Sequence, residues 1–311
     1  METPLTKPRD EVWVVRTMLF VPGHMKDFIL KAARSEADCI VLDLQDAVPP
    51  DMKAEARVGI RNILMSGLLK HKTVMVRLNP PDTGMTELDV DAVVCEQLNG
   101  FVYPMASTPQ EIRVLDGMLS LEERTLDLHR GHFSVVVLVE TPLGVINAYR
   151  MARASERVVG LLFGAEDYLA EMQGRYDAEQ LVLLTPRAHI AMAARAAGVE
   201  AIDTPYVDVR DLEGLKAHAR RARDLGMSGM LVISPRQIPI AHAVYTPSEG
   251  EVRDAEGIVR MAEDARKAGR GYAVIEGQLV SPSREKQARK VLARAAAIRE
   301  MELQSAEPSK S

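Results

Sequence analysis

Short apolar runs recur along the whole chain, each bounded by turn-forming residues. Most are rich in Val, Ile or Leu and show no alternation of apolar and polar positions, which is typical of strands buried on both faces of a parallel sheet. Eight such runs are present, and we expect a strand at each: residues 17–21, 39–44, 73–78, 101–104, 134–139, 158–163, 200–203 and 230–233.

Segments with helical spacing separate these runs, for example residues 25–37, 51–69, 108–121 and 186–197. Asp51, Thr108 and Thr185 are suitable N-caps, and Pro109 and Pro186 suit the first helical position. Eight strands alternating with helices predict an α/β fold, a (β/α)8 TIM barrel over residues 14–245. An open doubly wound sheet is the alternative, but Pro-Gly-His at 22–24 is a poor match to its glycine-rich loop.

The pattern changes after residue 245. Residues 246–249 indicate a helix start, the helix would continue to about 268, and two short strand-like runs at 273–276 and 278–280 precede a basic helix at 283–301. We therefore expect a C-terminal helical segment over 246–303, covering the barrel mouth or packing on a neighbouring subunit.

Bulk composition narrows the classes of function. The 311 residues are 47% hydrophobic, enough for one large core, and the net charge of −5 argues against nucleic-acid binding. The two cysteines make no disulfide framework, and no apolar run approaches the ~20 residues that span a bilayer. The composition and the polar first residues predict a cytoplasmic protein with no membrane partner.

Carboxylates follow two consecutive predicted strands. Glu140 comes directly after the run at 134–139, and Asp167 follows the run at 158–163 after one helix. Parallel strands present their carboxyl ends at one end of a barrel, where active sites form, and oxygen ligands suit a hard divalent cation. The pair predicts a metal site, although a single carboxylate in such a place can also be a helix N-cap.

Further charged residues lie at the same predicted strand ends. Arg77 would point into the mouth, where an unpaired cation is costly unless it meets an anion. Asp43 and Asp46 could support the metal or an arginine, or could simply hold loops. Arg236 could bind an anionic ligand or be an ordinary surface charge.

Taken together, the strand ends resemble a known family. The segments 16–23, 42–48, 76–79, 139–142 and 164–167 are similar, in order, to the serial motifs of the citrate lyase beta subunit-like (CitE-like) family within the HpcH/HpaI aldolase group. The resemblance extends to 185–187, 234–237 and 245–249 and covers about residues 16–279.

This resemblance implies a Mg2+-dependent carbon–carbon lyase. Its substrate would be a 3-hydroxyacyl-CoA such as citramalyl-CoA, malyl-CoA or citryl-CoA, cleaved to acetyl-CoA and a 2-oxo acid. Glu140 and Asp167 match the family's metal ligands, and Arg77 matches the arginine that binds the substrate oxygens. Phe20 and Lys31 fall where relatives contact CoA or substrate, and homotrimers or hexamers are usual.

Three positions depart from the family pattern. Ser281 stands where many relatives carry an aspartate as acid or base, Met105 replaces a lysine, and Gln45 replaces a glutamate. These changes leave two alternatives open: an aldolase on free 2-oxo acids without CoA, or a non-catalytic protein that binds Mg2+ and a 2-oxo acid.

Overall fold

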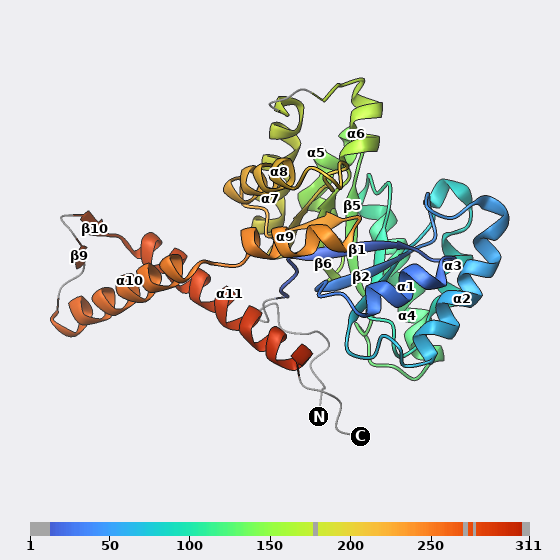
Figure 1. Cartoon of the computed structure of the whole chain (residues 1–311), viewed down its shortest axis with the longest axis horizontal. Helices are drawn as coiled ribbons and strands as arrows, with labels where there is room; N and C mark the ends of the chain where they lie inside the picture. Colours follow the sequence, from blue (N-terminus) through green and yellow to red (C-terminus); the bar gives the residue numbers. More distant parts are fainter. Residues whose placement is uncertain (1–12, 177–179, 270–272, 276–277, 307–311) are drawn as a thin grey trace. The chain divides into compact units, whose positions relative to one another are not determined.

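Eight parallel strands close into a barrel in the computed structural model, which describes residues 13–176, 180–269, 273–275 and 278–306 (Figure 1). Each strand pairs with its sequence neighbours, and β1 pairs with β8 to close the ring. The strands are β1 (Thr17–Pro22), β2 (Cys39–Asp43), β3 (Thr73–Arg77), β4 (Gly100–Tyr103), β5 (Ser134–Val139), β6 (Val158–Phe163), β7 (Glu200–Asp203) and β8 (Gly229–Val232). The TIM-barrel prediction is confirmed.

Helices connect successive strands and surround the barrel (Figure 1). They are α1 (Lys26–Ala33), α2 (Lys53–Met65), α3 (Thr86–Val93), α4 (Pro109–Thr125), α5 (Pro142–Ala152), α6 (Ala165–Met172), α7 (Leu181–Ala197), α8 (Leu212–Asp224) and α9 (Ile238–Tyr245). Short 3-10 turns lie at η1 (Pro50–Met52), η2 (Pro81–Thr83) and η3 (Pro235–Gln237). No helix of the described part of the chain combines the length and apolar character needed to cross a bilayer.

The strand residues divide between two apolar layers. One set, which includes Met18, Val41, Met75, Val136 and Leu162, forms a cluster of its own. The residues at alternating positions, with the buried faces of the helices, form a larger cluster outside the strands. The two layers explain why the strand runs carry no apolar–polar alternation: both faces of every strand are covered.

Two helix starts differ from the sequence prediction, and one agrees. Thr108 is the N-cap of α4 with a full capping box to Glu111, as its position predicts. The expectation for Thr185 is wrong, because α7 begins at Leu181 and carries Pro186 inside the helix. The prediction that Asp51 is an N-cap is also wrong, since Asp51 lies within η1.

The C-terminal segment forms a separate compact unit from Thr246 onward. It contains α10 (Glu249–Lys267), the antiparallel pair β9 (Ala273–Ile275) and β10 (Gln278–Val280), and α11 (Pro282–Ala306). Ser248 caps α10 through a capping box with Glu251, which confirms the helix start predicted at 246–249. Glu276 and Gly277, part of the predicted strand pair, lie outside the described residues.

Candidate active site at the carboxyl ends of the strands

The fold brings several of the predicted site residues to one end of the barrel. Asp43 ends β2, Arg77 ends β3, and Glu140 follows β5. Asp167 lies in the first turn of α6, directly after β6. Asp46 lies in the loop that follows β2.

The other predicted residues are more dispersed. Phe20 lies in β1 with its ring centroid 5.0 Å from the Arg77 guanidinium carbon, a cation–π contact at the mouth. Arg236 is exposed in η3, after β8. Lys31 is exposed in the last turn of α1, with its Nζ 5.3 Å from the centroid of the Phe28 ring. Lys31 therefore lies in the turn of α1 opposite to the helix start that follows β1.

Arg77 and Asp43 form a buried, bidentate ion pair. Arg77 Nε and Nη2 donate to the Asp43 carboxylate over 2.6 and 2.7 Å, and register pairing places the two residues side by side on β2 and β3. The same carboxylate accepts backbone N–H groups from Gln45 and Ala47 at 2.9 and 3.0 Å. Arg77 Nη1 lies 3.3 Å from Asp46 Oδ2 at the open side of the pair. The guanidinium is therefore fixed in place and still reaches the mouth.

Glu140 is the most unusual acid of the site. Its side chain is buried, with 2% of the residue exposed, and Oε1 accepts the Met105 backbone N–H over 2.7 Å. The pKa of Glu140 is raised from 4.5 to about 8, chiefly by burial; the Met105 N–H and Arg77 oppose the rise, and the negative charges of Asp167 and Asp46 add to it. Among the described residues no cation lies within ion-pair distance of Glu140. A bound cation would therefore stabilise the ionised form of the Glu140 carboxylate.

Met105 serves the site through its backbone rather than its side chain. Its φ of 53° lies in the left-handed region, which a non-glycine residue adopts only under constraint. In this conformation the Met105 N–H points at Glu140. The sequence shows only that the family's lysine is replaced by Met105. The structure shows that the Met105 backbone N–H donates a hydrogen bond to Glu140, a predicted metal ligand.

Asp167 and Glu140 fit a Mg2+ site of the kind that relies on few protein ligands. Asp167 is exposed, and its charge acts on Glu140. The adjacent acid, Glu166, instead accepts a hydrogen bond from the Tyr176 hydroxyl over 2.9 Å. No group of three or more His, Cys, Asp or Glu residues within the described ranges could hold a metal. Two carboxylates agree with Mg2+, which keeps several waters and takes substrate oxygens as further ligands.

Asp203, the acid at the end of β7, is not available to a metal. Its carboxylate is fully buried and accepts two hydrogen bonds from Arg187, both 2.9 Å long. His218 Nε2 lies 3.1 Å from the same carboxylate. Asp203 therefore holds β7 to α7 and α8.

Lys53 is a supporting residue that sequence reasoning missed. Its buried ammonium donates to the carbonyl oxygens of Leu44 and Gln45 over 2.7 and 2.8 Å, and to Asn79 Oδ1 over 2.6 Å. These bonds tie the loop after β2 to α2 and to the end of β3. A lysine in the first turn of a helix gives no sequence signal that it is buried.

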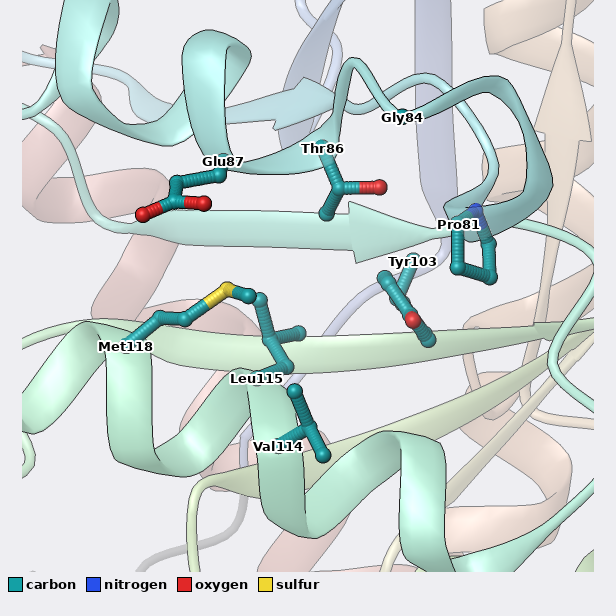
Figure 2. A pocket seen from close by; sticks show the side chains of 8 residues that line it. All are labelled: Pro81, Gly84, Thr86, Glu87, Tyr103, Val114, Leu115 and Met118. Atoms are coloured by element: carbon teal, nitrogen blue, oxygen red, sulfur yellow. The ribbon is translucent and has the colours of Figure 1, made fainter.

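A cavity of about 170 Å3 lies outside the strand barrel, between α3 and α4 (Figure 2). Tyr103 of β4, whose side chain belongs to the outer apolar layer, faces it. The other lining residues are Pro81, Gly84, Thr86, Glu87, Val114, Leu115 and Met118. None of the predicted site residues lines this cavity, so it is separate from the candidate active site.

Gly164 limits the space around Glu140 and gives a direct test of the site's geometry. A Cβ at Gly164 would lie 2.7 Å from Glu140 Oε2 and 2.8 Å from its Cβ, too close for both to stay in place. We expect Gly164→Ala to displace the carboxylate and weaken Mg2+ binding by about tenfold or more, about 1.4 kcal/mol, measured by titration calorimetry.

The matched control for this variant is Gly117→Ala. Gly117 lies in α4, and a Cβ there meets nothing within 4 Å. The control should leave Mg2+ affinity unchanged. Equal Mg2+ affinity in Gly164→Ala and the parent would show that Glu140 does not hold the metal in this position.

Comparison with known proteins adds to this geometry. The family model described as HpcH/HpaI aldolase/citrate lyase matches residues 16–235. The citrate lyase subunit beta of Haemophilus influenzae is 32% identical over 280 residues, which cover 90% of this chain and 96% of that protein. The (3S)-malyl-CoA thioesterase of Cereibacter sphaeroides is 31% identical over 283 residues, covering 91% of this chain and 95% of that protein.

A solved structure is similar over nearly the whole chain. The crystal structure of CitE from Mycobacterium tuberculosis in complex with magnesium, acetoacetate and coenzyme A matches with a TM-score of 0.73 and 28% identity. The match covers 91% of this chain and 99% of that chain.

Proposed function

Since this chain belongs to the HpcH/HpaI aldolase/citrate lyase family and is a lyase, we propose that it cleaves or forms a 3-hydroxyacyl-CoA in a Mg2+-dependent reaction. The products of cleavage would be acetyl-CoA and a 2-oxo acid. The observation that carries the proposal is the buried Glu140 carboxylate, which lies near Asp167 and the anchored Arg77 without a cationic partner among the described residues.

In this proposal Glu140 and Asp167 hold the Mg2+. Both offer carboxylate oxygens, the ligands that Mg2+ prefers. When bound, the ion supplies a Lewis acid for the oxygens of the 2-oxo acid. The similar CitE of M. tuberculosis is described as a complex with magnesium, which supports the same ion here.

Arg77 would bind the carboxylate and keto oxygens of the 2-oxo acid. Its pairing with Asp43 fixes the guanidinium plane before substrate arrives, so the Arg77 side chain loses little conformational entropy on binding. Phe20, which packs against the guanidinium, would close one side of the substrate site. Lys31 and Arg236 are exposed cations that could meet the phosphates of CoA on the protein surface.

A cleavage assay tests the proposal. Malyl-CoA, citramalyl-CoA and citryl-CoA would each be mixed with the purified protein, following release of acetyl-CoA and the 2-oxo acid. We expect turnover of one ester that EDTA abolishes and excess Mg2+ restores. No turnover of any ester, with Mg2+ and pyruvate still bound, would contradict the proposal and favour the CoA-independent or non-catalytic alternative.

We further propose that the protein assembles as a homotrimer or hexamer through α5 and α7. These helices pack side by side and leave large apolar side chains exposed, Ile146 being 69% exposed. The exposed set comprises Leu143, Ile146 and Tyr149 of α5 with Leu181, Leu184 and Met192 of α7. Exposed apolar side chains that gather on neighbouring helices can mark an interaction surface.

Ile146→Asp tests this assembly, because a charge on the contact face is costly to bury. We expect light scattering to give the mass of an oligomer for the parent and a smaller mass for the variant. A monomeric parent, or an Ile146→Asp protein with the parent's mass, would refute the proposed interface.

The two helices of the C-terminal segment bury few large apolar side chains among the residues whose burial is described. The apolar side chains buried in α10 and α11 include one valine, one isoleucine and several alanines. Such a small core seldom holds two helices together alone. We propose that residues 246–303 cover the barrel mouth or pack on a neighbouring subunit.

A further inference from the structure

Most carboxylates at the strand ends accept hydrogen bonds from other residues or are proposed metal ligands. Asp43 accepts hydrogen bonds from Arg77 and two backbone N–H groups. Asp203 is enclosed by Arg187 and His218, and Glu166 accepts from Tyr176. Glu140 and Asp167 are the proposed metal ligands. Asp46 differs from these carboxylates, because its one ion pair, with Arg77, leaves most of the side chain exposed.

Asp46 is exposed but firmly placed. Its side chain is 66% exposed, and Oδ2 lies 3.3 Å from Arg77 Nη1. The residues on both sides of it are anchored: the Gln45 and Ala47 N–H groups donate to Asp43, and Lys53 Nζ donates to the Gln45 carbonyl. The loop therefore presents an accessible carboxylate next to the guanidinium that would bind the substrate oxygens.

Cleavage of a 3-hydroxyacyl-CoA needs a base next to the substrate hydroxyl. The hydroxyl on the carbon that becomes the ketone must lose its proton as the carbon–carbon bond breaks. The oxygen keeps the electron pair of its O–H bond and forms the C=O bond, while the pair of the broken bond moves to the acetyl-CoA carbon. That carbon then takes up one proton, so the reaction neither consumes nor releases protons overall.

We propose that the Asp46 carboxylate takes the proton from this hydroxyl during cleavage and returns it during condensation. This role rests on the proposed function, because Arg77 has to bind the oxygen in question. Contact with Arg77 places Asp46 beside that oxygen, and its exposure lets the proton pass on to water.

The electrostatic surroundings agree with a basic carboxylate. Partial loss of water and the charges of neighbouring acids raise the pKa of Asp46 above its ordinary value, and neighbouring cations oppose this. The charged groups that act on it are Asp43, Glu140, Asp167, Arg77 and Lys53. A higher pKa makes the carboxylate a stronger base.

Asp46→Asn tests this role against Asp51→Asn, which removes the same charge from an exposed position in the following 3-10 turn. We expect Asp46→Asn to lower kcat for the cleaved ester by about 100-fold or more. The acidic limb of the kcat–pH profile should disappear, and Asp46→Glu should restore part of the rate. Mg2+ and pyruvate affinities by calorimetry should stay within about threefold, about 0.7 kcal/mol, of the parent. Asp51→Asn should behave as the parent throughout.

The outcomes separate the two proposals. A parent that cleaves no ester overturns the proposed function and this inference together. A parent that cleaves while Asp46→Asn keeps its rate and acidic limb overturns the role of Asp46 alone. Loss of pyruvate affinity along with rate would make Asp46 a binding residue instead.

Discussion

Glu140→Gln is expected to abolish Mg2+ binding and turnover while making the metal-free protein more stable at neutral pH. The pKa of Glu140 rises from 4.5 to about 8 on folding, chiefly through burial. The unfolded chain therefore releases this proton at lower pH than the folded one, so the stability of the metal-free parent falls as pH rises from about 4.5 to about 8. At pH 7 the cost is on the order of 3 kcal/mol, and glutamine does not incur it.

Two measurements check this result. Titration calorimetry should show Mg2+ affinity lowered by at least about 100-fold, about 2.7 kcal/mol, in Glu140→Gln and in Asp167→Asn. Urea unfolding in EDTA should show that the stability advantage of Glu140→Gln over the parent is larger at pH 8 than at pH 5. Glu166→Gln is the matched control, because the Glu166 carboxylate bonds Tyr176 and should leave Mg2+ affinity unchanged. Unchanged affinity in both variants would show that Glu140 and Asp167 do not bind Mg2+.

Arg77→Ala should have two separable effects. It removes the proposed contact to the 2-oxo acid, so the affinity for pyruvate and oxaloacetate should fall by at least about 30-fold, about 2 kcal/mol, with Mg2+ still bound. It also leaves the buried Asp43 carboxylate without its cation, which costs about 3–5 kcal/mol of stability.

A double variant separates binding from stability. Asp43→Asn combined with Arg77→Ala leaves no unpaired buried charge, so it should recover part of the lost stability while remaining as poor in 2-oxo acid binding as Arg77→Ala. Urea unfolding and calorimetry in saturating Mg2+ measure the two quantities. If pyruvate and oxaloacetate bind Arg77→Ala as tightly as the parent, Arg77 has another role.

The barrel was predictable because its physical cause lies in local sequence. Strands covered on both faces must be apolar without alternation, and all eight runs of this kind became strands of one ring. The start of α7 was not predictable, because a proline in the second turn of a helix imitates a proline at the first position. Tertiary packing, not local sequence, determines that α7 continues through Pro186.

The site was predictable only where residue type and strand position suffice. Arg77 and Asp43 end neighbouring strands, but their pairing depends on a strand register that no local pattern records. The N–H that Met105 gives to Glu140 depends on a backbone angle, and the burial of Lys53 depends on how the loop after β2 folds over it. Asp203 shows the converse: its sequence position resembles that of a ligand, yet Arg187 and His218 already occupy it.

The most direct test of the central claim is a crystal structure of the protein grown with Mn2+ in place of Mg2+ and with pyruvate. Mn2+ accepts the same oxygen ligands and can be located by its anomalous signal. We expect one ion bound by the carboxylates of Glu140 and Asp167, with the pyruvate oxygens shared between the ion and Arg77. An ion bound elsewhere, or pyruvate bound away from Arg77, would contradict the proposed active site.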